Sequence, residues 1–582
     1  MSQNATVAAR LREFADLLEA RDVDFKPRAY RDAAQSVEDL SEPIEDVVDE
    51  GLDAVTDIEN VGEGIGNKIV EYVETGSIEE LEAEREKLPA DIEALTRVEG
   101  VGPKTVKRLY DALGIETLDD LEAAAENEEI REVSGFGAKT EANILENLDF
   151  ARQAQERKLL GEARPIADEV LDTLADVPAA ERSEVAGSLR RWRATIGDVD
   201  VLVASDDGGA VSDGLVDWDR VDDVIETGPT KTSVRIEDVR VDLRVVTPSE
   251  FGSALQYFTG SKDHNITLRN YAIDHGKKVN EYGVFDVSDV DDPDEGQRVG
   301  EVLARETEED VYEALGLPWI PPEMREDNGE IDAALDGDLP SLVTESDIRG
   351  DLHTHTDWSD GGHTIEEMLE AAAEFGHEYY CISDHAAGAG VFGDSGLTDD
   401  EITDQIDAIE TAAADVDLEV FAGIEANVDA DGEVGEVGEA VMAELDLVVA
   451  SPHSDLGGES DQTDRLVAAV EHEYVDVLGH PSGRLLNSRK AMTFDPQTLG
   501  AAAAANDVAL EVNANPHRLD HWGEAVKAAI DEGATVVIDT DAHGPGELNF
   551  LRYGVHTVRR GWATPDDVLN ARDADGVRTF LH

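Results

Sequence analysis

The chain has 582 residues, enough for several domains that each bury a core of their own. Its formal net charge is −86, but apolar periodicity persists almost throughout, which excludes a disordered acidic chain and favours the solvated surface of a protein from a high-salt cytoplasm. A single cysteine excludes an intrachain disulfide. Without a signal peptide or an apolar run of membrane-spanning length, we expect a cytoplasmic protein with no membrane partner.

The first 150 residues contain three copies of one pattern, in which a hydrophobic residue and Gly-x-Gly precede a helix with a basic residue near its start. Glycines let the first N–H groups of a helix approach a DNA phosphate closely. An ordinary turn between helices explains one copy, whereas repetition at intervals of roughly 35–40 residues favours binding to the DNA backbone. The predicted DNA-binding residues are Gly62, Gly64, Gly66, Lys68, Gly100, Gly102, Lys104, Gly135 and Gly137.

Two alternating stretches further along predict neighbouring strands with acidic side chains on one face. Asp198 and Asp200 are separated by one apolar residue, and Asp242 stands in the second stretch, 239–246. Like charges this close are unfavourable without a cation between them. Three such carboxylates can hold two metal ions, an arrangement that supports phosphoryl transfer.

A pair of aspartates also arises by chance in so acidic a chain, so the surrounding residues matter. Gly187 and Ser188 precede the pair and offer backbone N–H groups and a hydroxyl to a triphosphate. Arg191 adds a guanidinium suited to phosphate oxygens. We expect Trp192, in the same loop, to serve packing.

Together with Tyr257-Phe258-Thr-Gly260-Ser261 and Asn265, these residues resemble, in order and spacing, the palm of family X DNA polymerases. The resemblance implies that Asp198 and Asp200 bind two Mg²⁺ ions, and that Asp242 binds the catalytic one and helps to deprotonate the primer. It also implies a bulky wall against the incoming sugar at Tyr257 and Phe258. The implied nucleotide-binding residues are Gly187, Ser188, Arg191, Gly197, Tyr257, Phe258, Gly260 and Asn265, the last on the base.

In the beta-type members of this family, the first helical domain carries a lysine with 5′-deoxyribose-phosphate lyase activity. Alignment of 64–72 on that motif puts Tyr72 at the position of the lysine, and tyrosine cannot form an imine. Lys68, one helical turn earlier, is then expected to contact a phosphate. We therefore expect lyase activity to be absent or weak.

Histidine is concentrated in the last part of the chain, since only His264 and His275 of the 15 histidines precede residue 350. Seven apolar stretches alternate there with helical Ala/Glu-rich stretches, which is typical of a β/α barrel. Polar residues follow the stretches and should converge on one mouth of the barrel. His with Asp and Glu, and no Cys, favours a catalytic cluster of Mn, Zn or Fe.

The order of these residues resembles the polymerase-and-histidinol-phosphatase (PHP) domain. The resemblance implies a site for up to three ions, Mn²⁺ or Zn²⁺, that are held by His353, His355, Asp360, His385, Glu425, His453, His480, Asp541 and His543. Asn513 and His517 also follow a strand but match no ligand of that site. The histidines expected on the surface are His363, His377, His472, His521, His556 and His582.

The sequence thus predicts a multidomain α/β chain. Its parts are two helical helix-hairpin-helix domains (1–88 and 89–150), a nucleotidyltransferase-type α+β palm (151–246), a nucleotide-selecting subdomain (247–320), a linker (321–347) and a distorted β/α barrel of PHP type (348–582). The implied function is gap-filling synthesis in base-excision repair, with dNTPs and gapped or primed DNA as substrates, joined to a 3′–5′ exonuclease or phosphoesterase. We expect a monomer with base-excision-repair proteins as partners. A DNA-end-binding scaffold with an inactive palm, and a small-molecule phosphatase fused to a DNA-binding module, remain alternatives.

Overall fold

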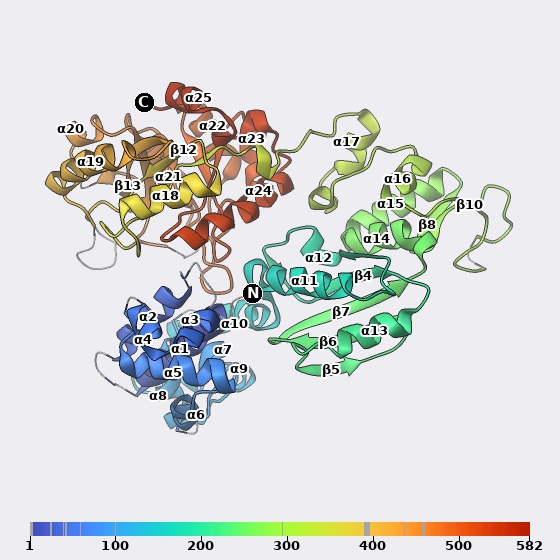
Figure 1. Cartoon of the computed structure of the whole chain (residues 1–582), viewed down its shortest axis with the longest axis horizontal. Coiled ribbons are helices and arrows are strands. Elements are labelled where there is room, and N and C mark those ends of the chain that lie inside the picture. Colours follow the sequence, from blue (N-terminus) through green and yellow to red (C-terminus); the bar gives the residue numbers. More distant parts are fainter. Residues whose placement is uncertain are drawn as a thin grey trace.

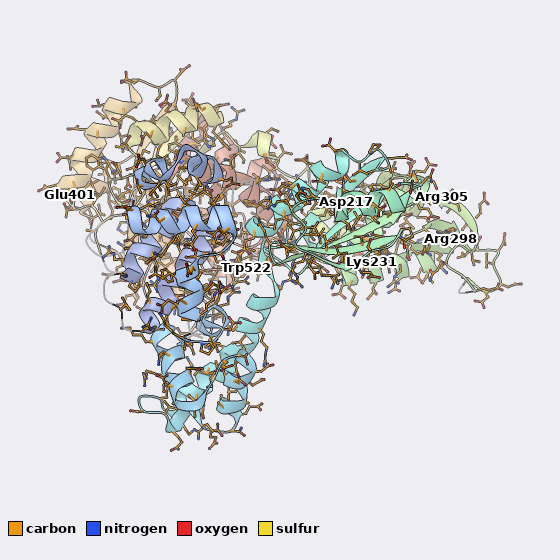
Figure 2. The ribbon with its side chains drawn as sticks, turned by 60° about the horizontal axis from the view of Figure 1, so that its bottom comes forward. Asp217, Lys231, Arg298, Arg305, Glu401 and Trp522 are labelled. Atoms are coloured by element: carbon orange, nitrogen blue, oxygen red, sulfur yellow. The ribbon has the colours of Figure 1, made fainter. Side chains whose placement is uncertain are left out.

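The structure is a computed structural model that describes residues 4–21, 23, 26–38, 40, 44–58, 60–85, 87–98, 100–293, 295–388, 396–435, 437–456 and 460–582. A helical region and a β/α barrel lie on one side. The palm extends to the other, together with the predicted nucleotide-selecting subdomain (247–320), which we call the thumb (Figure 1). Figure 2 shows this arm from another side, with Lys231 in the palm and Arg298 further out, away from Glu401 in the barrel. Among the described residues, no helix has both the length and the apolar character that crossing a membrane requires.

The N-terminal region is entirely helical. Its elements are α1 (Asn4–Ala20), α2 (Lys26–Glu38), α3 (Ile44–Glu50), α4 (Leu52–Asp57), α5 (Glu63–Thr75), α6 (Glu79–Arg85), α7 (Ile92–Thr96), α8 (Pro103–Leu113), α9 (Leu118–Glu126), η1 (Ile130–Glu132) and α10 (Ala138–Glu156). One hydrophobic core extends from Val7 in α1 to Ala151 in α10. The two predicted helical domains therefore share a core, and the boundary between them at residue 88 stays a prediction.

The palm is a five-stranded sheet with the strand order β2-β4-β7-β6-β5. Its elements are β1 (Lys158–Leu159), α11 (Leu160–Ala175), β2 (Arg182–Val185), α12 (Gly187–Arg190), β3 (Thr195–Ile196), β4 (Val199–Ala204), α13 (Gly208–Val216), β5 (Asp223–Glu226), β6 (Lys231–Ile236) and β7 (Val239–Val246). Apolar residues of β4 and β7 pack against α11 and α13. Because side chains alternate along a strand, Asp200 and Asp242 point to the other face.

The thumb follows with η2 (Pro248–Glu250), α14 (Phe251–Thr259), α15 (Lys262–Asp274), a three-stranded antiparallel sheet and α16 (Glu308–Leu315). Its strands are β8 (Lys277–Asn280), β9 (Gly283–Asp286) and β10 (Glu301–Ala304). The segment 321–347, for which the sequence predicts a linker, contains η3 (Pro322–Met324), α17 (Glu330–Asp336) and η4 (Glu345–Asp347). Met324 and Ile331 of this segment belong to the thumb core, and Arg325 is fully buried.

The C-terminal part is the predicted distorted β/α barrel. Parallel strands follow the order β11 (Gly350–Asp351), β12 (Tyr379–Ile382), β13 (Glu419–Val428), β15 (Leu447–Pro452), β16 (Val477–Leu478), β17 (Ala509–Asn513) and β18 (Val536–Asp539). Between and after them lie α18 (Ile365–Phe375), α19 (Asp399–Ala413), β14 (Val434–Gly435), α20 (Glu439–Met442), α21 (Thr463–Val470), α22 (Pro496–Asn506), α23 (Gly523–Asp531), η5 (Pro545–Phe550), α24 (Leu551–Arg560), η6 (Pro565–Asp567), η7 (Leu569–Ala571) and α25 (Ala574–Phe580). A parallel bridge between Thr354 and Ala542 joins the two ends of the sheet.

Candidate functional sites

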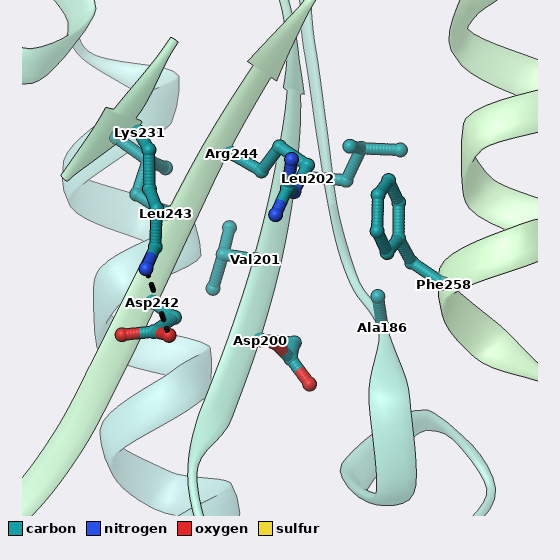
Figure 3. A pocket seen from close by; sticks show the side chains of 9 residues that line it. All are labelled: Ala186, Asp200, Val201, Leu202, Lys231, Asp242, Leu243, Arg244 and Phe258. Atoms are coloured by element: carbon teal, nitrogen blue, oxygen red, sulfur yellow. Dashed lines mark ion pairs between the residues drawn. The ribbon is translucent and has the colours of Figure 1, made fainter. Parts of the chain in front are cut away.

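The three palm aspartates lie together on two paired strands, with Asp198 directly before β4, Asp200 in β4 and Asp242 in the middle of β7. Asp200 stands opposite Asp242 in the parallel pairing of β4 with β7. Carboxylate oxygens of Asp198, Asp200 and Asp242 lie within 4.8 Å of one another. Figure 3 shows Asp200 and Asp242 side by side at one end of a pocket.

Gly187 brings the loop before β4 close to this carboxylate group. Its φ angle is +60°, and a Cβ atom at this position would lie 2.1 Å from Oδ2 of Asp200. Any side chain at this position would therefore displace either the loop or Asp200. The backbone N–H of Ala186 also donates to the carbonyl oxygen of Asp200 at 2.8 Å, which holds the loop in place.

The pKa values of Asp200 and Asp242 are shifted in opposite directions. Burial, with the negative charges of Asp198 and Asp242, raises the pKa of Asp200 to about 7. Burial acts to raise the pKa of Asp242 as well, but two hydrogen bonds from Arg240 outweigh it and lower that pKa. A divalent cation between these carboxylates would relieve their repulsion, so the residues fit the metal ions that the fold implies.

A pocket beside the aspartates is bounded by aromatic and cationic side chains (Figure 3). Arg244 lies over the ring of Phe258 at 4.4 Å from its centroid, and Lys231 Nζ lies 3.9 Å from Asp242 Oδ2. Tyr257 packs edge-on against Phe258. The lining residues are Ala186, Asp200, Val201, Leu202, Lys231, Asp242, Leu243, Arg244 and Phe258.

Two of the predicted nucleotide-binding side chains already have partners within the chain. The Nδ2 group of Asn265 donates to the carbonyl oxygens of Tyr257 and Gly260, at 2.8 and 3.2 Å. Gly260 is glycine for a steric reason, because a Cβ there would lie 2.6 Å from Asn265 Oδ1. Arg191 donates from Nη1 to the Thr259 carbonyl oxygen at 2.7 Å.

The nine histidines and carboxylates predicted in the barrel form one cluster at the ends of its strands. Three overlapping groups have ligand atoms within 4.8 Å of one another: His355 with Asp360, His385 and His543; His353 with His355 and Glu425; and His385 with Glu425 and His453. His480 joins them through Glu425, and Asp541 through His355, each contact at 3.0 Å. The side chain of Glu425 is fully buried at the centre.

Neighbouring residues orient these rings, and the sequence analysis missed them. Nδ1 of His353 lies 2.6 Å from Oε1 of Glu511, and Nδ1 of His453 lies 2.8 Å from Oδ1 of Asn427. A ring held at Nδ1 directs Nε2 toward the cluster, which is the usual arrangement around a bound metal. The signal for Glu511 was weak because it lies inside strand β17 rather than at its end.

Asn513 and Arg518 also lie at the mouth of the barrel. The Nδ2 group of Asn513 donates to Oδ2 of Asp541 at 2.9 Å, and Nε of Arg518 lies 3.6 Å from the same oxygen. Asn513 was noted in the sequence without a role. Its contact makes it a partner of a predicted ligand rather than a ligand.

The cluster fits the metal ions that its fold implies. Nε2 of His353 and Nδ1 of His355 are buried and have no hydrogen-bond partner among the described residues. Buried polar atoms without partners are costly, and metal coordination would satisfy them. Burial acts to raise the pKa of Glu425, but the surrounding histidines, His385 first, outweigh it and lower that pKa well below its usual range.

Two histidines that the sequence analysis assigned to the surface are buried instead. His377 and His521 are 7% and 0% exposed. His377 packs between Phe375 and Tyr380, and His521 between Phe494 and Trp522. Burial lowers the pKa of each, to about 4 and about 3, so both are neutral core residues.

The three repeated turns of the helical region share one backbone geometry. Gly62, Gly102 and Gly137 are the N-caps of α5, α8 and α10, and none of these helices has a side-chain cap. The residue two positions before each N-cap has a left-handed φ angle. These residues are Asn60, Gly100 and Gly135, at 57°, 83° and 90°.

This geometry corrects the alignment of the first repeat. Asn60, not Gly64, is equivalent to Gly100 and Gly135, while Gly64 and Gly66 lie inside α5. The register therefore shifts by one helical turn, and the position that the alignment gave to Tyr72 falls on Lys68. Tyr72 therefore does not stand in place of the lyase lysine.

Taken together, the fold and these sites indicate a DNA-binding enzyme with two separate clusters of potential metal ligands, one in the palm and one in the barrel. Family models match the parts separately: the DNA polymerase beta thumb at 254–326, a helix-hairpin-helix domain at 2–78, a SAM-like helix-hairpin-helix tandem at 52–112 and 92–149, and the PHP domain at 351–514.

One relative matches nearly the whole chain. The DNA polymerase/3′-5′ exonuclease PolX of Bacillus subtilis (strain 168) is 35% identical over 565 residues, which cover 96% of each protein. DNA polymerase lambda of Rattus norvegicus is 25% identical over 344 residues, 56% of each chain. The chain belongs to the family X DNA polymerases that carry a PHP domain. It is a DNA polymerase joined to a 3′–5′ exonuclease, and its activities depend on divalent metal ions.

Proposed function

We propose that the palm fills gaps in DNA and that Asp198, Asp200 and Asp242 hold its Mg²⁺ ions. The observation that carries this proposal is the in-register pairing of Asp200 with Asp242 beside Gly187. Bound Mg²⁺ ions would neutralise charge on the triphosphate and favour attack by the primer 3′-hydroxyl.

The residues around the aspartates then bind different parts of the nucleotide. Gly187 and Ser188 offer backbone N–H groups and a hydroxyl to the triphosphate, and Arg191 offers its guanidinium. Phe258, which lines the pocket, and Tyr257, packed against it, form the wall against the sugar. Gly197, Gly260 and Asn265 complete the nucleotide site, with Asn265 on the base once its bonds to the chain have opened.

The barrel cluster hydrolyses phosphodiesters at DNA 3′ ends. Its nine ligands are His353, His355, Asp360, His385, Glu425, His453, His480, Asp541 and His543, and they suit up to three Mn²⁺ or Zn²⁺ ions. Bound ions would activate water and neutralise the scissile phosphate. The unpartnered buried nitrogens of His353 and His355 support this assignment.

The helix-hairpin-helix turns hold the DNA backbone. A Cβ atom at Gly62, Gly102 or Gly137 would meet nothing within 4 Å, and each of these residues has a negative φ angle, so neither packing nor backbone conformation explains these glycines. Close approach of a phosphate to an uncapped helix N-terminus explains them. Lys104 and Lys68 then contribute charge beside the turns. We assign the protein to base-excision repair, as a monomer inside a salt-rich cell, a setting that suits its net charge of −86.

One experiment tests both assignments. Extension of a primer across a one-nucleotide gap and removal of 3′-terminal nucleotides are measured on one preparation, with Mg²⁺ and with Mn²⁺. A small phosphomonoester serves as the alternative substrate for the barrel. The assignment is wrong if the protein hydrolyses the phosphomonoester faster than DNA 3′ ends, or if it fails to extend the primer.

A further inference from the structure

A side chain of the PHP barrel reaches the nucleotide-binding loop of the palm. Arg560, the last residue of α24, donates from Nη1 to the carbonyl oxygen of Arg191 at 2.7 Å. The same nitrogen lies 3.0 Å from Oε1 of Glu326, at the end of the region 254–326 that matches the DNA polymerase beta thumb. The Arg560 side chain is only 8% exposed, so these contacts are shielded from water.

Glu326 links that arginine to the palm. Its Oε1 atom accepts from Nε of Arg191 at 3.0 Å and lies 3.6 Å from Nη1 of Arg193. One carboxylate oxygen is thus shared by three guanidinium groups from two domains. Burial acts to raise the pKa of Glu326, but the charges of Arg560, Arg191 and Arg193 outweigh it and lower that pKa.

The contacts leave the Arg191 guanidinium held at two points. Nε binds Glu326 and Nη1 binds the carbonyl oxygen of Thr259, while no described contact uses Nη2. The guanidinium also acts electrostatically on Asp200, the central aspartate of the palm. A free arginine would lose side-chain freedom on binding a triphosphate, whereas an arginine that is already fixed loses less.

We propose that Arg560 and Glu326 are positioning residues for DNA synthesis. Together they fix the guanidinium of Arg191 in the orientation that meets the triphosphate of the incoming nucleotide. The PHP domain therefore sets the nucleotide affinity of the palm, in addition to its own hydrolytic activity. This inference rests on the proposed role of Arg191 as a triphosphate ligand.

The test compares kinetic constants for a one-nucleotide gap in the full-length protein. We expect Glu326→Ala and Arg560→Met each to raise the KM for dNTP about tenfold, with kcat changed by no more than about twofold. The double variant should resemble the single ones, because both remove one shared support. Glu326→Gln keeps an oxygen that accepts from Nε of Arg191, so it should recover part of the affinity.

The matched control is Arg559→Met, on the neighbouring residue of α24. Arg559 binds Glu323 and the carbonyl oxygen of Val343, both at 2.7 Å, and makes no described contact with Arg191 or Glu326. It should leave the KM for dNTP unchanged. The 3′–5′ exonuclease rate, measured on every preparation, reports whether the barrel is folded.

The outcomes distinguish the positioning role of Arg560 and Glu326 from the triphosphate-binding role of Arg191. If Arg191→Ala raises the KM but Glu326→Ala and Arg560→Met do not, the positioning role is wrong and the triphosphate role stands. If Arg191→Ala leaves the KM unchanged, both are wrong. An equal rise in Arg559→Met would mean that general docking of the barrel, not this contact, supports the palm. If Arg560→Met has no exonuclease activity, its barrel is not folded. The Glu326 variants then test the same contact without a change in the barrel.

Discussion

The indole of Trp192 in the palm lies flat against the imidazole of His556 in the barrel, with ring centroids 3.6 Å apart and planes 4° from parallel. Arg164 and Arg552 also lie over the indole, at 4.7 and 5.4 Å from its centroid. Trp192 has a φ angle of 52°, which is unfavourable for a residue with a Cβ atom and persists only where packing holds it. The loop that carries Ser188 and Arg191 therefore depends on the barrel for its conformation.

The same interface predicts a pH dependence of stability. Nδ1 of His556 lies 2.7 Å from Oε1 of the buried Glu323, which also accepts from Arg559 at 2.7 Å. Burial acts to raise the pKa of Glu323, but these partners outweigh it and lower the pKa to about 2. A depressed carboxyl pKa stabilises the fold above the unfolded pKa of about 4.3, and this contribution is lost as the pH falls toward about 2.

We therefore expect Glu323→Gln to destabilise the protein at pH 7 by roughly 3 kcal/mol, because it leaves the half-buried guanidinium of Arg559 without its carboxylate partner. The difference from the parent should narrow below about pH 4.5 and vanish near pH 2. Thermal unfolding at constant salt measures it, with Glu313→Gln on the exposed side of α16 as the control. A difference that stays constant from pH 7 to pH 3 contradicts the ionic origin.

The two metal sites predict two separable losses of activity. Asp200→Asn should abolish nucleotide incorporation and leave 3′-end hydrolysis largely intact, because Asp200 lies in the palm group and not in the barrel cluster. His353→Ala with His355→Ala should do the reverse. Primer extension and 3′ degradation on the same labelled DNA measure both. Loss of both activities in either folded variant would refute the assignment of one activity to each site.

The sequence predicted the members of the two candidate metal clusters, because each of these residues stands at a recognisable place. Alternation in 199–203 and 239–246 fixes the face of the strands that carries Asp200 and Asp242, and barrel ligands follow apolar stretches. The contacts that support the two sites were harder to predict. Glu511 lies within a strand, and Glu326 meets Arg560 across a separation of 234 residues that no local pattern encodes.

The register of the first hairpin turn failed for a different reason. With Asn60 in place of the first glycine, the residues from Asn60 to Gly66 fit the Gly-x-Gly pattern in two ways, at 60–62 and at 64–66, one helical turn apart. The deciding quantity is the left-handed φ angle of Asn60, a conformation that asparagine adopts more readily than most residues. Glycine content alone favoured 64–66 as the turn, whereas in the structure the turn is formed by 60–62.

The net charge of −86 predicts an unusual salt response. Screening weakens the repulsion between surface carboxylates, so the unfolding temperature should rise as KCl increases from about 0.1 M to about 2 M. Affinity for DNA should fall less steeply with KCl than that of a basic polymerase, since screening also weakens repulsion between protein and phosphates. Circular dichroism and fluorescence anisotropy measure the two effects. Full stability at low salt would contradict the first expectation. A steep loss of DNA affinity with added KCl would contradict the second.

Lys68 carries the last prediction, because the corrected register puts it at the position of the lyase lysine. Its Nζ atom lies 2.8 Å from Oε2 of Glu80, beside the edge-on ring pair of Phe14 and Tyr30, at 5.7 and 5.9 Å from their centroids. Burial acts to lower the pKa of Lys68, but bonds to Glu80 and Tyr30 outweigh it and raise that pKa. An imine forms only from a neutral amine, so this ion pair holds the lysine in its unreactive form.

We therefore expect slow borohydride trapping on a preincised abasic substrate, lost in Lys68→Ala and in Lys68→Arg, which keeps the charge but cannot form the same imine. Glu80→Gln should accelerate trapping at neutral pH, since each unit by which the amine pKa falls raises its neutral fraction about tenfold. Tyr72→Phe is the control and should leave trapping unchanged, because the corrected register removes Tyr72 from this role. Trapping that survives Lys68→Arg would assign the chemistry to another amine. A rate that Glu80→Gln leaves unchanged would show that the ion pair does not limit the reaction.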